Sequence, residues 1–373
     1  MRRSLTLLAL STILFACSAG ADPAAAASRD VASAELAHGR GAPVGVLTRN
    51  LYLGAELTPV IQAADFPHFL AATTAVWAMV NRNDFHVRAR AVAEEVAWTR
   101  PALIGLQEAY TWRLQDPGDA LTGGTTAATT VIYDYVPELL AQLQRRGLHY
   151  RVAAQVELFD FEAPIATGQD VRMTDHGVVL ARADVETRSP VGQVFSTLLP
   201  VQVLGQAHPV KRGWASVEAR VRGGAWFRFV TTHLESYHPG VRVAQAQELA
   251  AVLAGETGPV VLVGDLNSHP GEEGEAVLAA AGFTDTWSTL YPARQGLTCC
   301  WPEDLTVSSP PAPPFYERID YVLYRGSAGG GAEIRPLLAD VLGDRPWERE
   351  RGVWPSDHSG LAAWLTIGAA PRD

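Results

Sequence analysis

Between residues 150 and 232 the chain contains five short β-rich runs in succession. They cover residues 150–157, 177–183, 194–204, 214–221 and 226–232. Strands that follow one another directly along a chain pair readily in antiparallel fashion, because a tight turn is enough to join them. This stretch therefore predicts antiparallel β-structure at the centre of the fold.

Helices and strands alternate on either side of this stretch. Residues 44–51, an amphipathic segment at 85–99 and a buried run at 102–107 form a strand, helix, strand unit. Further helices are expected at 133–146, 241–254 and 274–281, and further strands at 259–264, 319–325 and 360–367. With 47% hydrophobic and 19% charged residues, a disordered, collagenous or coiled-coil protein is excluded. We predict one layered α/β domain over residues 43–373, in which the proline-rich run 308–314 is a loop.

The amino terminus has the pattern of an export signal. Two arginines precede an apolar stretch at residues 5–15, which is too short to span a bilayer as a helix and is followed by small residues. The protein is therefore expected to be exported, either as a cell-envelope lipoprotein or in secreted form.

The run Leu-Phe-Ala-Cys at residues 14–17 resembles the lipobox of bacterial lipoproteins. On this interpretation residues 1–16 are removed and Cys17 becomes a lipid anchor to the membrane. Ordinary cleavage after Ala21 is the alternative. The Ala-rich stretch 17–42 is expected to be a flexible tether.

The charge of the chain limits which substrates it can bind, and its cysteines limit which disulfides it can form. The formal net charge is −10, no basic run is present, and Lys211 is the only lysine. Non-specific binding of nucleic acid that depends on neutralising its phosphates is therefore disfavoured. Carboxylates gathered around a divalent metal would also give an acidic total, so a phosphate-bearing substrate stays open. Cys299 and Cys300 are adjacent, and they form either a vicinal disulfide or two free buried thiols.

Polar side chains stand where the buried apolar runs end. In chain order they are Asn50, Glu108, His233, Asp265, Asn267, Asp320, Asp357 and His358. All are oxygen or imidazole donors, and Mg²⁺ prefers oxygen ligands from carboxylates and amides. A histidine held by a carboxylate can act as a general base. Any one of these residues could be an ordinary turn residue, but the whole set predicts metal-assisted chemistry.

The motifs around these residues resemble the endonuclease/exonuclease/phosphatase family, which contains deoxyribonuclease I, apurinic endonucleases, bacterial sphingomyelinases and inositol polyphosphate 5-phosphatases. The similar runs are Thr-Arg-Asn-Leu at 48–51, Leu-Gln-Glu at 106–108, Asp-His-Gly-Val-Val-Leu-Ala-Arg at 175–182, Thr-Thr-His-Leu-Glu at 231–235, Gly-Asp-Leu-Asn at 264–267, Arg-Ile-Asp-Tyr-Val at 318–322 and Ser-Asp-His at 356–358. Their order and spacing agree with the family over residues 44–367.

This resemblance implies a fold and a metal site. The fold would be a four-layer α/β/β/α sandwich of two packed mixed β-sheets flanked by helices, as in deoxyribonuclease I, with the site at one rim. Glu108 and Asn50 would hold Mg²⁺, for which Mn²⁺ could substitute, and Asp357 would lie near the same ion or a second one. The metal would polarise a phosphoryl oxygen.

The resemblance also implies roles for the remaining residues. Asp320 would orient His358 as the base that takes a proton from the attacking water. His233 would hydrogen-bond the phosphate or protonate the leaving oxygen, while Asp265 and Asn267 would position the nucleophile and the phosphate.

The substrate is less constrained. The form of the 231–235 block disfavours the apurinic endonuclease branch, and we expect a monomeric phosphodiesterase acting on phospholipid, of the phospholipase C or sphingomyelinase kind. An extracellular deoxyribonuclease is the alternative, and a catalytically silent binding module is a third reading. His176, Lys211 and Arg212 are candidate substrate contacts. Exposed apolar side chains at the rim would favour the lipid, and an arginine-lined groove would favour nucleic acid.

Overall fold

The computed structural model describes residues 43–308 and 315–369. The expected signal segment (1–16), the tether (17–42) with its lipidation site Cys17, and residues 309–314 of the proline-rich loop lie outside the described residues. Among the residues described, no helix is both long and apolar enough to cross a membrane.

The larger sheet is mixed and has eight strands in the order β15-β16-β1-β2-β6-β3-β4, with β5 also paired to β6. Its strands are β1 (Val44–Asn50), β2 (Leu103–Gln107), β3 (Thr111–Gln115), β4 (Thr130–Asp134), β5 (Tyr150–Pro164), β6 (Asp170–Arg182), β15 (Ala332–Leu342) and β16 (Gly360–Ala369). Only β1 and β2 are parallel neighbours, joined by a helical crossover; the other described pairs are antiparallel. The parallel pair ends at one edge of the sheet.

The second sheet repeats this plan with six strands in the order β13-β14-β12-β11-β10-β7. Its strands are β7 (Val185–Val194), β10 (Gly213–Val221), β11 (Phe227–His233), β12 (Val260–Asp265), β13 (Thr284–Asp285) and β14 (Asp320–Arg325). Here β11 and β12 are the parallel neighbours. A separate two-stranded sheet consists of β8 (Leu199–Val203) and β9 (Gln206–Val210).

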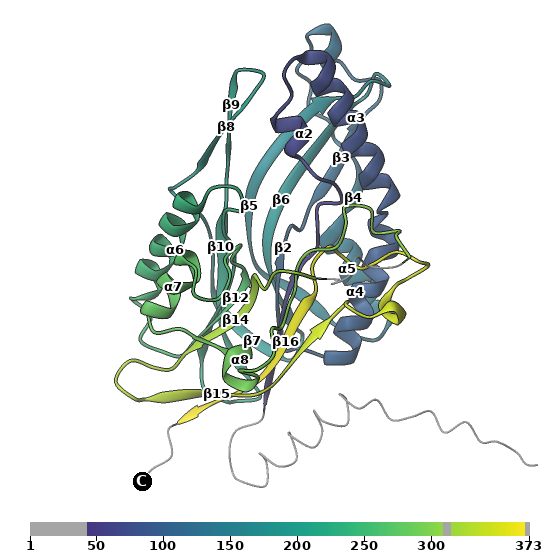
Figure 1. The fold of residues 1–373 in the computed structure, drawn as a ribbon. Coiled ribbons are helices and arrows are strands. Elements are labelled where there is room, and N and C mark those ends of the chain that lie inside the picture. Colours follow the sequence, from purple (N-terminus) through teal and green to yellow (C-terminus); the bar gives the residue numbers. More distant parts are fainter. Residues whose placement is uncertain (1–42, 309–314, 370–373) are drawn as a thin grey trace, which may run out of the picture.

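Helices cover the outer faces of both sheets, which gives the four layers (Figure 1). The first sheet carries α2 (Thr58–Ile61), α3 (Phe66–Arg82), α4 (Phe85–Thr99) and α5 (Tyr135–Arg145), and the second carries α6 (Pro239–Leu253) and α7 (Glu273–Ala280). Shorter elements are α8 (Thr286–Leu290) and the 3₁₀ turns Ala120–Thr122 and Pro346–Glu348. The predicted α/β/β/α sandwich is therefore confirmed.

The space between the sheets is filled by small and β-branched side chains, as the apolar strand patterns require. Gly105 of β2 shows how closely the layers approach, since a Cβ atom there would lie 2.6 Å from Thr231 Oγ1 of the opposite sheet. Glycine is thus the residue that lets the two strands pack at this point.

Several element boundaries differ from those expected. The expected helix at 133–146 begins only at Tyr135, because residues 130–134 pair with β3 as a strand. The run 194–204 is not one strand: Val194 ends β7, and β8 begins at Leu199 in a different sheet. The helix α3 was not expected, and its start is fixed by Asp65, whose side chain accepts a hydrogen bond from the His68 amide.

Candidate active site

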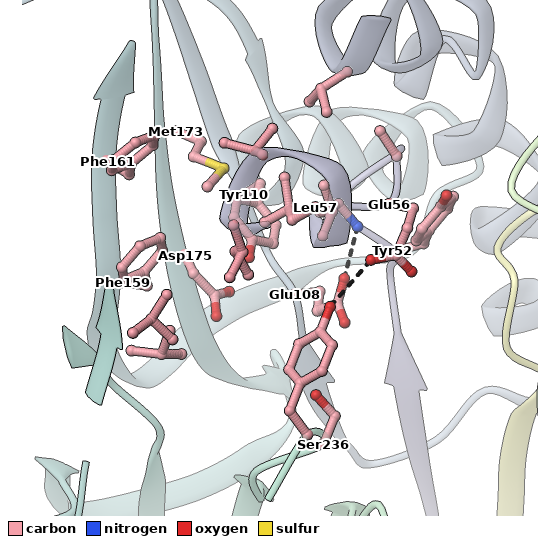
Figure 2. Close-up of a pocket in the computed structure, with 18 of the residues that line it drawn as sticks. Tyr52, Glu56, Leu57, Glu108, Tyr110, Phe159, Phe161, Met173, Asp175 and Ser236 are labelled. Atoms are coloured by element: carbon pink, nitrogen blue, oxygen red, sulfur yellow. Dashed lines mark hydrogen bonds between the residues drawn. The ribbon is translucent and has the colours of Figure 1, made fainter. Parts of the chain in front are cut away.

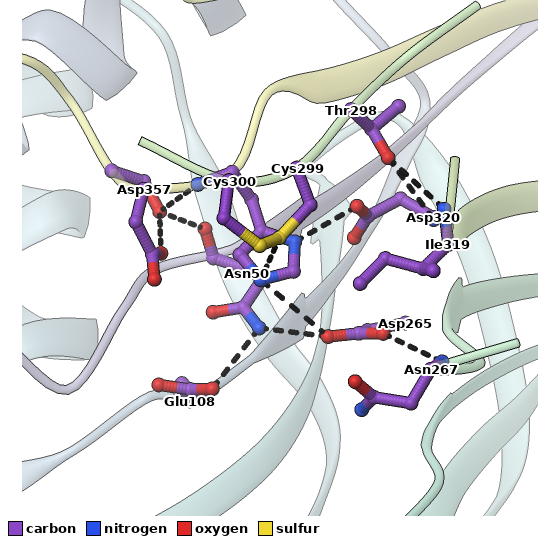
Figure 3. The surroundings of a disulfide bond; sticks show 12 residues. Asn50, Glu108, Asp265, Asn267, Thr298, Cys299, Cys300, Ile319, Asp320 and Asp357 are labelled. Atoms are coloured by element: carbon purple, nitrogen blue, oxygen red, sulfur yellow. Dashed lines mark hydrogen bonds and ion pairs between the residues drawn. A yellow bond between two sulfur atoms is a disulfide. The ribbon is translucent and has the colours of Figure 1, made fainter. Parts of the chain in front are cut away.

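The strand ends of the two sheets meet at one rim of the sandwich (Figure 3). Asn50 ends β1 and Glu108 follows β2, so the parallel pairing of these strands brings them side by side. His233 and Asp265 end β11 and β12 and are direct register partners. All the strand-end residues expected from the sequence gather at this rim, as Asn50, Glu108, His233, Asp265, Asn267, Asp320, Asp357 and His358.

Asn50 links the two sheets. Its Nδ2 donates to Glu108 Oε1 and to Asp265 Oδ2, both at 3.1 Å, and its Oδ1 accepts from the Tyr52 amide at 2.9 Å. Glu108 also accepts a 2.7 Å hydrogen bond from the Leu53 amide. Glu108 adopts a left-handed backbone conformation, with φ of 53°, which is uncommon outside glycine and typical of functional turns. The carboxylate of Glu108 is therefore held by two neighbours, Asn50 and the Leu53 amide, at the end of β2.

His358 is held between two carboxylates. Its Nδ1 is 2.9 Å from Asp320 Oδ2, and its Nε2 is 3.7 Å from Asp265 Oδ2. Burial opposes the charged imidazole, but Asp320, Asp357 and Asp265 outweigh burial and raise the pKa of His358 well above its ordinary value. The arrangement is that of an imidazole whose tautomer and orientation are fixed by a carboxylate.

The backbone of His358 is fixed by residues that sequence reasoning had not singled out. Ser356 Oγ donates to the Asn50 carbonyl at 2.9 Å and accepts from the His358 amide at 3.2 Å. The buried Arg49 guanidinium donates to the His358 carbonyl and pairs with Glu95 Oε1 at 2.7 Å. Arg49 belongs to the Thr-Arg-Asn-Leu motif at 48–51, but the sequence does not show which element its side chain contacts.

His233 has a different environment. Its Nδ1 is 3.0 Å from an Arg212 nitrogen, and because a guanidinium can only donate, Nδ1 must accept and the proton of the neutral ring must lie on Nε2. Burial, with Arg212 and His358 as further causes, lowers the pKa of His233 well below its ordinary value. His233 is thus a neutral hydrogen-bond donor whose Nε2 lies 3.5 Å from Asp265 Oδ2.

Asp265 and Asn267 form a turn after β12. Asp265 Oδ1 accepts from the Asn267 amide at 2.9 Å, and Asn267 Nδ2 donates to the Leu234 carbonyl at 3.0 Å. Burial raises the pKa of Asp265 to about 7, against the opposing effect of His358. Asn267 adopts φ of 48°, which again places a non-glycine residue in the left-handed region.

The donor set fits a divalent cation. Glu108 and Asp357 both line the same cavity, and burial raises the pKa of Asp357 to about 6, with His358 lowering it and the negative charge of Glu108 raising it further. A cation between like-charged carboxylates would relieve this repulsion. Asp265, Asp320 and His358 also have ligand atoms within 4.8 Å of one another. Since the Asp320 hydrogen bond and the raised pKa favour a protonated His358, that cluster is better suited to proton transfer.

Cys299 and Cys300 are joined by a vicinal disulfide in the structure. Cys299 is buried with its Sγ 3.6 Å from His358 Nε2, and Cys300 lines the cavity. Of the two alternatives left open by the sequence, the structure has the disulfide.

Of the three candidate substrate contacts, only one lines the cavity. Arg212 lines the cavity beside His233, whereas His176 and Lys211 are not among its lining residues. His176 Nδ1 lies 3.1 Å from the Ala109 carbonyl, and Lys211 is exposed.

A cavity of about 410 Å³ begins at this carboxylate cluster and extends between the first sheet, α2, α3 and the β8–β9 hairpin (Figure 2). Its far part, here called the apolar chamber, is lined by Val76, Trp77, Phe159, Phe161, Met173 and Val201. Sequence reasoning did not find it, because these residues come from four separate elements and each fits an ordinary core pattern.

The family assignment rests on a model of the endonuclease/exonuclease/phosphatase family, which matches residues 76–358. Members of this family are phosphoester hydrolases that use divalent metal ions. The comparison with curated protein sequences gave no match.

Solved structures agree with the fold. The D. rerio TDP2 complexed with a single-strand DNA product is 16% identical, with a TM-score of 0.51 over 87% of this chain and 100% of that one. Endonuclease/exonuclease/phosphatase proteins of Bacteroides thetaiotaomicron and Bacteroides vulgatus also give TM-scores of 0.51, at 14% and 15% identity, over 88% of this chain and 98% and 100% of theirs. At such identities the likeness concerns the fold alone. Together with the match over residues 76–358, it shows that the chain belongs to the endonuclease/exonuclease/phosphatase family.

Proposed function

We propose that this protein is a Mg²⁺-dependent phosphodiesterase that hydrolyses its ester by attack of water. The observation that carries the proposal is the pairing of His358 Nδ1 with Asp320 at 2.9 Å beside the carboxylates of Glu108 and Asp357. A proton-transferring imidazole next to a site for a hard cation is what in-line attack on a phosphodiester requires.

The metal would be held by Glu108 and Asp357, with Asn50 contributing through the second lone pair of its Oδ1. A cation bound there would stabilise negative charge on the phosphoryl oxygens and, by like-charge repulsion, favour the neutral form of His358. Asn50 itself keeps the Glu108 carboxylate in place through the 3.1 Å hydrogen bond from its Nδ2.

Proton movements are assigned to His358. Its Nε2 faces the interior of the site, and Asp320 stabilises the imidazolium formed when Nε2 takes a proton from water. His233 is assigned to the phosphate instead of the leaving oxygen, because burial and Arg212 keep it neutral and able to donate one hydrogen bond from Nε2. Asp265, between the two imidazoles, positions both.

A phospholipid-like substrate is favoured over nucleic acid. Among the described residues, the cavity lining contains one guanidinium, that of Arg212, and no lysine, which gives little to hold a polyanion. Tyr237 and Tyr316 are exposed near the opening, at 54% and 60%, as expected for a rim that meets amphiphiles. Tyr237 lines the cavity itself, and Tyr316 precedes the lining residue Glu317.

The proposed function also includes export of the protein to the cell envelope. The apolar stretch 5–15 and the Leu-Phe-Ala-Cys run support delivery to the cell envelope with a lipid anchor at Cys17. A monomer anchored in this way would meet its substrate at or near a membrane.

One activity panel tests the proposal. Purified protein is assayed with Mg²⁺ on a phospholipid, on plasmid DNA and on a chromogenic phosphodiester. We expect turnover of the lipid and of the chromogenic ester. Cleavage of DNA with no action on lipid would favour the extracellular deoxyribonuclease, and failure on all three would favour a binding module.

A further inference from the structure

The apolar chamber lies directly next to the proposed catalytic groups. Glu108, His233 and Asp357 line the same cavity as Phe161, Met173 and the other chamber residues. Its volume of about 410 Å³ falls within the range of about 300 to 1,000 Å³ that small-molecule sites occupy. A ligand with a phosphate at the carboxylate end would therefore extend its ester group into the chamber.

The chamber walls are apolar, and their aromatic rings pack against one another. Phe161 packs on Phe159 at 6.0 Å between ring centroids and meets the His208 ring at 5.2 Å, while Trp77 packs on Trp112 at 5.9 Å. Burying a hydrocarbon chain against such a surface favours binding by about 0.8 kcal/mol for each buried CH₂ group. It offers no comparable gain to a sugar-phosphate chain.

Asp175 provides a second, independent observation. It lies two residues from Met173 on β6, so both side chains are on the same face of the strand. Figure 2 shows it between Phe159 and Glu108, at the passage from the chamber to the carboxylate cluster. Its side chain is fully buried, and neither carboxylate oxygen has a hydrogen-bond partner of good geometry among the described residues. Its neighbours are Arg212, in a long ion pair of 3.9 Å, and the His176 amide, which both lower its pKa without outweighing burial.

A buried carboxylate without hydrogen bonds is costly, and native structures usually satisfy such groups. A hydroxyl or amide N–H on a ligand could donate to Asp175 from the position that the cavity leaves beside it. This group would lie between the phosphate and the hydrocarbon, which matches an amphiphile with a polar group next to its phosphoester.

We infer that the apolar chamber binds the hydrocarbon chain of an amphiphilic phosphoester, and that Asp175 accepts a hydrogen bond from a hydroxyl or amide beside the ester. The inference rests on the proposed phosphodiesterase function and deepens it, because it makes the chain and the polar group the determinants of specificity.

Chain length is the first test. The probes are 4-nitrophenyl alkyl phosphates with methyl, butyl, octyl and dodecyl chains, assayed with Mg²⁺ below their critical micelle concentrations. We expect kcat/KM to rise by up to about fourfold per added CH₂ until the chamber is full, and then to level off. A kcat/KM that does not change with chain length would overturn the inference.

Two chamber variants make this test specific. Ala163 also lines the cavity, and Ala163→Phe should fill the chamber so that kcat/KM no longer rises with chain length, whereas Met173→Ala should move the plateau to longer chains. Ala166→Phe, on the exposed turn after β5, is the matched control and should behave as wild type. Loss of chain dependence in the control, or its persistence in Ala163→Phe, contradicts the chamber as the chain site.

A binding measurement separates failure of this inference from failure of the proposed function. Dodecylphosphonate and methylphosphonate are titrated into metal-free protein by calorimetry and by tryptophan fluorescence, to which Trp77 and Trp112 in the cavity lining contribute together with the other eight tryptophans of the chain. We expect only dodecylphosphonate to bind, and Ala163→Phe to lose it. Binding without hydrolysis of any ester would refute the phosphodiesterase and keep the chamber, and hydrolysis without selective binding would do the reverse.

Asp175 is tested with a pair of dodecyl esters that differ by one hydroxyl beside the phosphate. Wild type should prefer the hydroxylated ester, and Asp175→Leu should lose the preference while Asp175→Asn keeps part of it. Equal preference in all three proteins would remove Asp175 from the inference. The rate of hydrolysis is then compared for the ester free in solution and for the same ester in phosphatidylcholine vesicles. This comparison distinguishes a free amphiphile from a membrane lipid as the substrate.

Discussion

Replacing Asp175 with asparagine should make the protein more stable at alkaline pH. Burial raises the pKa of Asp175 to about 7, Arg212 opposes the rise, and Glu108 adds to it. Since the folded-state pKa lies above the unfolded value of 3.8, the group's stabilising contribution is complete below pH 3.8 and is lost as pH rises through about 7. A rise of this size corresponds to about 4 kcal/mol over the whole range, of which about 3 kcal/mol falls between pH 5 and pH 8.

The assay is urea unfolding of metal-free wild type and Asp175→Asn at pH 5, 6, 7 and 8. The free energy of unfolding of the variant relative to wild type should increase by about 3 kcal/mol across this series. Asp184→Asn is the matched control, because the exposed Asp184 accepts hydrogen bonds from Arg182 that lower its pKa, so it stays ionised throughout and should give a difference that does not change from pH 5 to pH 8. A difference for Asp175→Asn that stays constant or decreases with pH would refute the reasoning.

The remaining predictions concern catalysis and location. His358→Ala should reduce turnover about 10²-fold to 10⁴-fold, and Asp320→Asn should reduce it somewhat less. The double variant should lose little more than His358→Ala, because the two side chains act as one unit. Additive losses in steady-state kinetics would contradict this. His233→Ala should impair nitrophenyl and alkyl esters alike, since His233 is assigned to the phosphate; selective rescue by the nitrophenolate leaving group would make it the acid instead. Cys17→Ser should move the protein from the membrane to the soluble fraction, and unchanged fractionation would favour ordinary signal cleavage.

The site could be predicted from the sequence because its residues stand at the ends of buried strands. Parallel pairing brings Asn50 to Glu108 and His233 to Asp265. Their position at one rim shared by the two sheets was expected from the family resemblance of the motifs. The two packed sheets were expected from the family resemblance of the motifs, whereas the helix at 85–99 followed from its apolar spacing and has the expected bounds in the structure.

Other features depend on contacts between elements that no local pattern specifies. The neutral state of His233 follows from its burial and from Arg212, which precedes it by a whole hairpin. The disulfide of Cys299 lies beside His358 only because a loop crosses the rim there. The apolar chamber is likewise invisible in the sequence, since a residue such as Met173 has the same apolar alternation whether it faces core or cavity.

Reconstitution with metal tests the central claim most directly. Wild type is stripped with EDTA and assayed on a chromogenic phosphodiester during titration with Mg²⁺ or Mn²⁺, next to Glu108→Gln, which keeps the size of the side chain and removes its charge. We predict no hydrolysis by the stripped protein, saturable recovery in wild type, and a loss of recovery in Glu108→Gln, because hard cations bind carboxylate oxygen. Full activity after exhaustive chelation, or equal recovery in Glu108→Gln, would contradict a metal-dependent phosphodiesterase centred on Glu108.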